Sequence, residues 1–147
     1  MAKAPAARVY DGACHCGAIE FSFETTLSPR RWPMLACQCR FCRGHGAVTA
    51  ADPAGIVRFN YTYPDRLRRY RFALRTADYL VCRECGMYVG AVMMTGNGGV
   101  ATINTNLLGE RPRGLAPAKA ETGYRSESLE ERRTRRRAQW TQVFGPV

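Results

Sequence analysis

The seven cysteines of this 147-residue chain fall into three closely spaced groups, and this spacing restricts the possible fold more than any other feature. Two groups are pairs, Cys14-x-Cys16 and Cys82-x-x-Cys85, and the third is the run Cys37-x-Cys39-x-x-Cys42 between them. An odd number of cysteines cannot pair completely in disulfides. In a reducing compartment, such clusters more often bind metal or carry out chemistry. The spacing therefore predicts two metal sites, one with four cysteines and one with three.

The two outlying pairs fit one closed zinc site. Residues i and i+2 of an extended chain point the same way, so Cys14 and Cys16 can present both sulfurs to one metal. Cys82 and Cys85 need a tight turn to converge, and Gly86 allows the backbone conformation of such a turn. Four thiolates complete a zinc tetrahedron, and the loss of structural zinc costs on the order of 10 kcal/mol of apparent binding free energy. We expect a structural site here; buried, reduced cysteines are the alternative.

The central run supplies three cysteines to a metal that prefers four ligands. Its spacing lets three sulfurs cap one face of a tetrahedron and leaves the fourth position open, as in catalytic zinc sites. A thiol bound there would become a thiolate, and a carbonyl bound there would be polarised. We predict Cys37, Cys39 and Cys42 as catalytic zinc ligands. Three roles are open for His45. It could be a fourth ligand, which would make the site structural, or a proton carrier, or a residue that only forms a hydrogen bond beside the site.

Short apolar stretches separated by proline, glycine and aspartate predict strands. The clearest is Gly17–Glu24, where Ile19, Phe21 and Phe23 alternate with other residues. Gly96–Gly99 lies between two further apolar stretches and predicts a hairpin. The other predicted strands are 32–36, 47–51, 56–60, 67–74, 79–81, 87–94 and 100–104. No stretch before residue 120 predicts a helix, so we expect an all-β domain.

The C-terminal stretch has a different composition. Ser128 and Glu131 have the spacing of a capping box, and residues 129–140 are rich in helix-forming arginine and glutamate. We predict a short C-terminal helix on whose surface Glu131 pairs with Arg135. The residues predicted to pack on the domain are Leu129, Arg136 and Trp140. The predicted organisation is a zinc-binding domain over residues 1–120 and a basic helix and tail over residues 121–147.

The chain is basic, with a formal net charge of +10. A positive field favours anionic ligands in general, small carboxylates as well as nucleic acid, so charge does not choose between them. The first eight residues lack the apolar core of a signal peptide, and no later stretch is long and apolar enough to span a bilayer. We therefore expect a cytoplasmic protein that does not associate with membranes.

Three motifs together resemble the glutathione-dependent formaldehyde-activating enzyme (GFA) family, which also includes the centromere protein V group. They are Gly12-Ala-Cys14-His-Cys16-Gly17, Cys37-x-Cys39-x-x-Cys42-Arg-x-His45-Gly46-Ala47 and Val81-Cys82-x-x-Cys85-Gly86. The resemblance covers roughly residues 9 to 110. It implies a β-tent fold of packed antiparallel sheets, a structural zinc on the two outlying pairs and a second zinc on the central run. It also implies addition of glutathione to formaldehyde to give S-hydroxymethylglutathione, formally the reverse of a carbon-sulfur lyase reaction.

The leading hypothesis is a zinc-dependent enzyme that joins a thiol, glutathione or a similar molecule, to formaldehyde or another small aldehyde. The thiolate would attack the aldehyde carbon, and water or His45 would carry the proton to the alkoxide. Arg40, Arg43 or Arg83 could hold a glutathione carboxylate, because arginine suits bidentate recognition of carboxylates.

Two other functions compete with this one. A binding module would use two structural zincs and the arginines of residues 132–137 to grip nucleic acid or another acidic partner. The acidic neighbours Glu130 and Glu131 and the lack of interleaved aromatics disfavour it, so nucleic acid is not an expected partner. A redox protein would use Cys82-x-x-Cys85, but this motif is not followed by the β-α unit that redox sites of this kind use.

Overall fold

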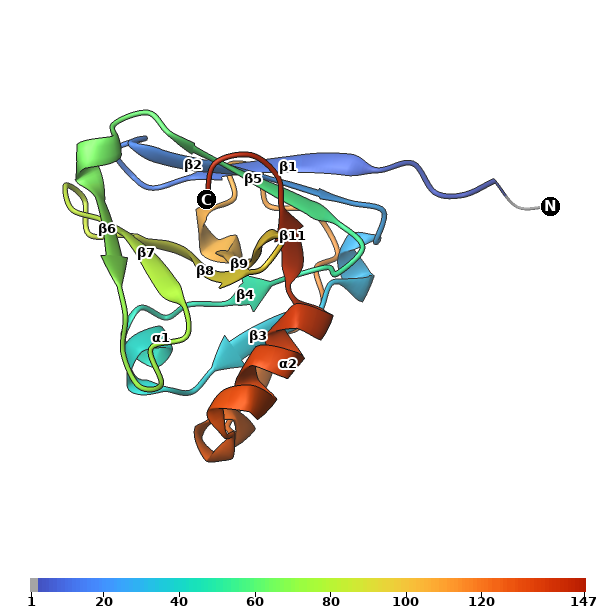
Figure 1. The fold of residues 1–147 in the computed structure, drawn as a ribbon. Helices are drawn as coiled ribbons and strands as arrows, with labels where there is room; N and C mark the ends of the chain where they lie inside the picture. Colours follow the sequence, from blue (N-terminus) through green and yellow to red (C-terminus); the bar gives the residue numbers. More distant parts are fainter. Residues whose placement is uncertain (1–2) are drawn as a thin grey trace.

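The computed structural model describes residues 3–147 and consists mainly of strands joined in one bent sheet (Figure 1). The strands are β1 (Arg8–Ala13), β2 (Ile19–Thr25), β3 (Met34–Cys37), β4 (Thr49–Ala50), β5 (Ile56–Tyr61), β6 (Leu67–Tyr70), β7 (Asp78–Cys82), β8 (Tyr88–Thr95), β9 (Gly98–Asn104), β10 (Lys119–Glu121) and β11 (Thr141–Val143). The two α-helices are α1 (Arg40–Gly44) and α2 (Leu129–Gln139). The predicted all-β class is confirmed.

The sheet has one long path and one branch. The path runs β1-β2-β5-β11-β9-β4-β3-β10, and β8, β7 and β6 extend from β9. Within residues 3–147 two pairs are parallel, β10 with β3 and β11 with β5, and the other strand pairs are antiparallel. Both parallel pairs use strands from the last 30 residues, which return to earlier strands through long connections.

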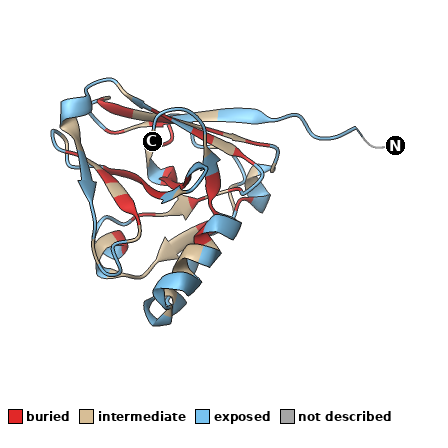
Figure 2. Cartoon of the chain, viewed as in Figure 1, coloured by how far each residue is buried: buried red, intermediate tan, exposed pale blue. Residues whose placement is uncertain are grey.

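Alternation along β2 builds the centre of the core, as predicted. Ile19, Phe21 and Phe23 are buried, while the residues between them are only partly covered. The main core cluster also includes Trp32, whose ring contacts the Phe23 ring edge-on. Figure 2 shows these buried segments running along the inner strands, with exposed residues on the outer face of α2. The core therefore fixes the strands that carry the cysteines.

The hairpin predicted around Gly96–Gly99 is confirmed as β8 and β9, paired from Gly90 with Ile103 to Thr95 with Gly98. Next to it, the register of β7 against β8 shifts between Leu80 and Val81. Such an irregularity re-aims the following side chain. It comes directly before Cys82, where β7 ends.

Two predictions of local secondary structure are wrong. Helix α1 forms before residue 120, because Cys39 at its N-cap accepts a hydrogen bond through Sγ from the Cys42 amide (3.4 Å). A five-residue helix is too short to show helical periodicity in sequence. The strand predicted over residues 67–74 ends at Tyr70, since the chain turns there through Ala73 (φ 53°) and Arg75 (φ 56°).

The predicted C-terminal helix is confirmed, and Ser128 caps it by accepting a hydrogen bond from the Glu131 amide (3.1 Å). Arg136 and Trp140 are buried as predicted, whereas Leu129 is 41% exposed and does not pack on the domain. The predicted ion pair of Glu131 with Arg135 does not form. Arg135 instead pairs with Glu127, which precedes the helix. The proposed boundary at residue 120 stays a prediction, and β11 lies between β5 and β9 in the sheet.

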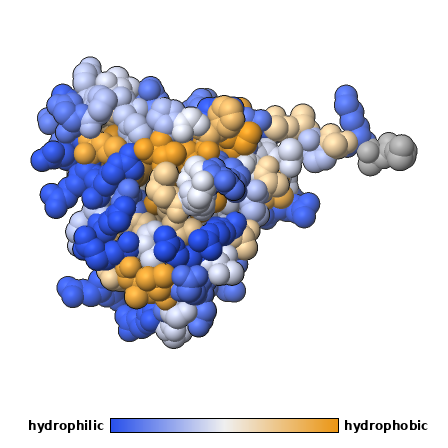
Figure 3. Space-filling model, viewed as in Figure 1, coloured by the Kyte–Doolittle hydropathy of each residue, from blue (hydrophilic) through white to orange (hydrophobic). Residues whose placement is uncertain are grey.

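Hydrophilic side chains cover much of the face drawn in Figure 3, and hydrophobic side chains gather in areas between them. Neither α-helix in residues 3–147 is long and apolar enough to cross a lipid bilayer.

Candidate metal centres

The two outlying cysteine pairs meet in space. The sulfur atoms of Cys14, Cys16, Cys82 and Cys85 all lie within 4.8 Å of one another. Cys14 Sγ is 3.7 Å from Cys16 Sγ, which is 3.5 Å from Cys82 Sγ. Four sulfurs at about 2.3 Å from a zinc ion at the centre of a tetrahedron would be about 3.8 Å apart. The spacing of this four-cysteine group therefore fits one metal ion.

Each pair is carried by a tight turn that ends in a glycine. Gly17 (φ +80°) donates its amide to the Cys14 carbonyl (3.0 Å), and Gly86 (φ +78°) donates to the Cys82 carbonyl (2.8 Å). A side chain would be strained at these φ values, so glycine permits both turns. The Ile19 amide also points to Cys14 Sγ (3.4 Å). Amide donors of this kind favour a thiolate at the sulfur.

The surroundings push thiol pKa values of this group apart. Burial raises the pKa of Cys14 to about 12. Burial acts in the same direction on Cys85, but hydrogen bonds from the Cys16 and Met87 amides oppose it and the pKa falls to about 6. Neighbouring sulfurs share protons in this arrangement, and a cation among them would replace those protons.

The central run forms a second, separate group. The sulfurs of Cys37, Cys39 and Cys42 lie within 4.8 Å of one another, with no fourth histidine, cysteine or carboxylate of residues 3–147 in the group. Cys37 ends β3, Cys39 caps α1, and Cys42 is buried on the first turn of that helix. A hydrogen bond with Cys42 lowers the pKa of Cys37 to about 5, and the same contact raises the pKa of Cys42.

Aromatic side chains hold α1 against the sheet. Phe41 lies between Cys39 and Cys42 in sequence, and its ring centroid is 4.7 to 5.7 Å from five other ring centroids. These rings belong to His45, Tyr70, Phe72, Tyr79 and Tyr88. Contacts of this kind stabilise a side chain beyond the burial of its area, so the geometry of the three sulfurs depends on this cluster.

A cavity of about 560 Å³ opens beside the three-cysteine group. Its wall includes Cys37, Cys42, Tyr79 and Tyr88 and residues of α2, among them Arg135 and Arg136. Burial raises the pKa of Tyr79 to about 12 and raises the pKa of Tyr88 well above its ordinary value, so both hydroxyls stay protonated at neutral pH. The volume lies within the usual range of small-molecule sites, about 300 to 1,000 Å³.

Comparison with known proteins agrees with this geometry. The family described as "Glutathione-dependent formaldehyde-activating enzyme" (GFA) matches residues 9–123. The chain belongs to this family. A crystal structure of a Rhodobacter sphaeroides protein is similar to it, with 32% sequence identity and a TM-score of 0.56, covering 76% of this chain and 99% of that one. No curated protein matches the sequence.

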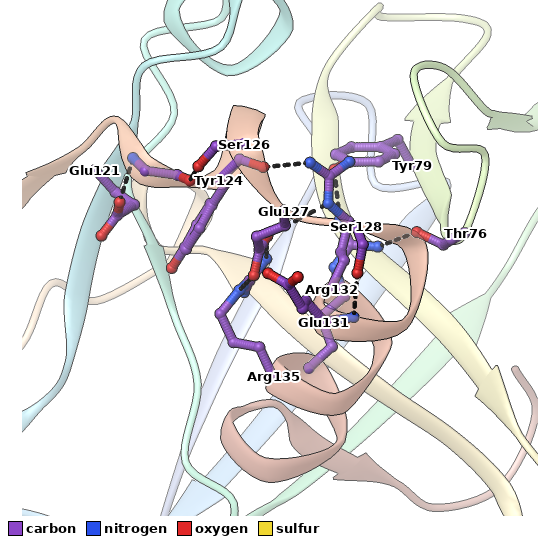
Figure 4. A network of polar contacts seen from close by, with 12 residues as sticks. Thr76, Tyr79, Glu121, Tyr124, Ser126, Glu127, Ser128, Glu131, Arg132 and Arg135 are labelled. Atoms are coloured by element: carbon purple, nitrogen blue, oxygen red, sulfur yellow. Dashed lines mark hydrogen bonds and ion pairs between the residues drawn. The ribbon is translucent and has the colours of Figure 1, made fainter.

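The GFA match includes both cysteine groups and ends before α2, which supplies part of the cavity wall. Glu127, just ahead of α2, accepts hydrogen bonds from Arg135 Nε (2.7 Å) and Nη2 (3.0 Å) and from Arg132 Nε (3.4 Å). The Arg135 guanidinium lies over the Tyr124 ring, 3.6 Å from its centroid. Figure 4 shows Glu127 between the two arginines. These contacts hold residues 124–135 in place beside the cavity.

Several predicted site residues lie elsewhere in this GFA-family structure. His45 is exposed and its ring contacts Phe41 at a tilted angle of 48°; it neither joins the three sulfurs nor lines the cavity. Arg40, Arg43 and Arg83 are also exposed and outside the cavity wall.

The arginines that do line the cavity, Arg135 and Arg136, are 93 or more residues from Cys42 in sequence. The burial predicted for Arg136 was the one sequence signal that pointed to an unusual arginine. Burial lowers its pKa, and the nearby cationic Arg135 acts in the same direction.

Proposed function

We propose that the protein is a zinc-dependent enzyme of the carbon-sulfur lyase type that joins a thiol, glutathione or a similar molecule, to formaldehyde or another small aldehyde. One observation carries this proposal: the three-cysteine group has no fourth ligand among residues 3–147, and two of its members, Cys37 and Cys42, line a cavity that can hold a small molecule. Membership of the GFA family supports the same reaction at family level.

The donor sets fit zinc at both groups. Thiolates are preferred zinc ligands, and the sulfur spacing of the four-cysteine group matches a closed tetrahedral site. The three-cysteine group offers one ligand fewer, which is the arrangement of a site that binds water or substrate in its fourth position. Zinc held by Cys37, Cys39 and Cys42 would supply Lewis acidity, lowering the pKa of a thiol bound beside it.

The reaction forms one carbon-sulfur bond. The thiol sulfur adds to the aldehyde carbon, the carbon-oxygen π bond breaks, and the proton of the thiol ends on the former carbonyl oxygen. Tyr79, protonated at neutral pH, lines the cavity and can donate a hydrogen bond to that oxygen. The role of His45 as proton carrier stays a prediction, and water in the cavity is the other carrier.

The test compares wild type with the triple variant Cys37→Ser, Cys39→Ser, Cys42→Ser. We expect about two zinc ions per freshly reduced wild-type chain and about one per variant chain, with the variant still folded. Calorimetry should detect glutathione binding to wild type only. Formaldehyde consumption in the presence of glutathione should likewise be limited to wild type.

A single zinc in wild type, or equal glutathione binding by both proteins, would contradict the proposal. A matched control is Arg83→Gln, an exposed change beside the four-cysteine group. It should keep both zinc ions and full thiol binding, which would show that neither measurement responds to surface charge alone.

The alternative of a nucleic-acid binding module is weakened by how the arginines of residues 132–137 are used. Arg132 and Arg135 pair with Glu127, and Arg136 is buried. These three side chains are occupied by contacts within the protein and are not free to bind phosphate groups. Salt-sensitive binding of DNA or RNA by wild type would nevertheless restore this alternative.

A further inference from the structure

Arg136 is a buried cation without a carboxylate partner. Its exposed fraction is 5%, and no acidic side chain of residues 3–147 lies within ion-pair distance of it. Its Nη1 donates to Thr76 Oγ1 (2.7 Å) and its Nη2 to the Tyr79 hydroxyl (3.3 Å). Its Nε is buried and has no hydrogen-bond partner.

Burial of the Arg136 charge without a carboxylate partner lowers the stability of the protein when no ligand is bound. A buried charge is destabilising unless an opposite charge and hydrogen bonds compensate it. Two neutral hydroxyls and the Trp140 ring, whose centroid is 4.6 Å from the guanidinium carbon, compensate it only in part. The guanidinium has five N–H groups and therefore keeps donors for a further acceptor. Arg136 lines the cavity that the three-cysteine group also lines.

The neighbouring charges distinguish Arg136 from the other residues of the cavity wall. Arg135 is already neutralised by the two-point contact with Glu127. The carboxylate of Glu121 accepts a hydrogen bond from the Gly123 amide (2.6 Å), and Lys119 is exposed. The wall thus holds three cationic side chains and one carboxylate, apart from the cysteines. Of the two arginines, Arg136 is the one that lacks a counter-ion.

We propose that Arg136 is the anion-binding residue of this cavity and that it selects thiols carrying a carboxylate. The inference rests on the proposed function for the thiol end: the sulfur lies toward Cys37 and Cys42, and the carboxylate lies at Arg136. The Tyr79 hydroxyl accepts a hydrogen bond from Arg136, and its own single proton remains available for the aldehyde oxygen. Because the family match ends at residue 123, this specificity comes from the segment beyond it.

The first test uses wild type and two thiols of nearly equal shape, 3-mercaptopropionate and its uncharged methyl ester. Calorimetry should give an affinity for the carboxylate that is about 10 to 100 times higher, the range expected for a hydrogen bond to a charged group. Equal affinity of the two thiols would overturn the inference and leave the proposed function standing.

The second test uses variants of α2. Arg136→Gln should remove the preference for the charged thiol while it still binds the ester, and Arg136→Lys should restore part of the preference. Arg137→Gln removes the same charge from the next, exposed position and should keep the full preference. A merely structural arginine would weaken both thiols equally in Arg136→Gln, and that result would contradict the inference.

Glutarate, which has carboxylates but no thiol, separates the two proposals. If neither thiol binds wild type, the proposed function fails, and glutarate then decides the anion site on its own. Glutarate binding that is lost in Arg136→Gln and kept in Arg137→Gln would support the site. Absence of glutarate binding together with absence of thiol preference would overturn it. Should Arg136→Gln fail to fold, the comparison of acid and ester on wild type still decides.

Discussion

The two cysteine groups use the same ligand atom in different surroundings. The four-cysteine group joins turns that are 66 residues apart in sequence, as between Cys16 and Cys82, and it takes no part in the wall of the large cavity. The three-cysteine group comes from six consecutive residues and forms part of that wall. Ligand type alone therefore does not fix the role of a metal site. Chain separation suits the first group to hold the fold together, and the missing ligand beside a cavity suits the second to chemistry.

The largest expected effect follows from breaking the four-cysteine group. Cys82→Ser should leave three ligands and unfold the domain, because structural zinc supplies on the order of 10 kcal/mol of apparent free energy and whole domains are stable by only about 5 to 15 kcal/mol. Far-UV circular dichroism during heating measures this. The matched control is Cys39→Ser in the other group, which should unfold cooperatively near the wild-type temperature. Similar curves for both variants would erase the distinction between the groups.

Removal of metal should separate the groups in the wild-type protein. A chelator at limiting concentration should lower the zinc content from about two to about one per chain while the circular dichroism is unchanged, because the site with three protein ligands is less completely coordinated. The thiol should stop binding at that point. If the structure is lost with the first zinc, the assignment of roles to the two groups is reversed.

The four-cysteine group could be predicted from the sequence because each of its two pairs is marked by a short local spacing. Cys14-x-Cys16 and Cys82-x-x-Cys85 each form a recognisable turn, and one metal needs both pairs. The alternation of Ile19 and its neighbours likewise predicts β2, since burial on one face of a strand repeats every second residue.

The cavity could not be predicted in the same way. The Arg136 side chain on α2 reaches the Tyr79 hydroxyl on β7, 57 residues away in sequence, and no local pattern encodes that contact. Arg135 pairs with Glu127, which lies outside the helix where the chain folds back. The partner expected from the sequence, Glu131, was chosen by the i,i+4 spacing, which applies only to pairs within one helix. Strand β11 contains three residues, too few to show a period.

A smaller effect should appear when the aromatic support of α1 is removed. Phe41→Ala deletes a half-buried ring that contacts five others, and we expect a loss of about 2 to 3 kcal/mol in the free energy of unfolding. Denaturant unfolding measures the loss. The zinc of the three-cysteine group should also bind more weakly, and that of the four-cysteine group should not. The exposed Phe144→Ala is the control and should change neither quantity.

The smallest expected effect concerns the ion pairs that hold α2 beside the cavity. Hydrogen bonds from Arg135 lower the pKa of Glu127, whose side chain is 13% exposed. A carboxyl whose pKa is depressed on folding stabilises the protein fully above its ordinary pKa of about 4.5 and loses this contribution as the pH falls through the folded pKa. Glu127→Gln should therefore cost about 1 to 2 kcal/mol at pH 7, and the difference from wild type should shrink below about pH 4.5.

Denaturant unfolding of wild type and Glu127→Gln between pH 3 and 8 checks this prediction. Glu130→Gln, an exposed change in the first turn of α2, removes an equal charge and should show a much smaller difference at every pH. A Glu127→Gln difference that grows toward acid pH has the wrong sign for a depressed carboxyl pKa. Such a result would mean that the ion pair of Glu127 with Arg135 does not stabilise the position of α2. Both zinc contents should stay unchanged in Glu127→Gln, because this contact orders the cavity wall and touches neither cysteine group.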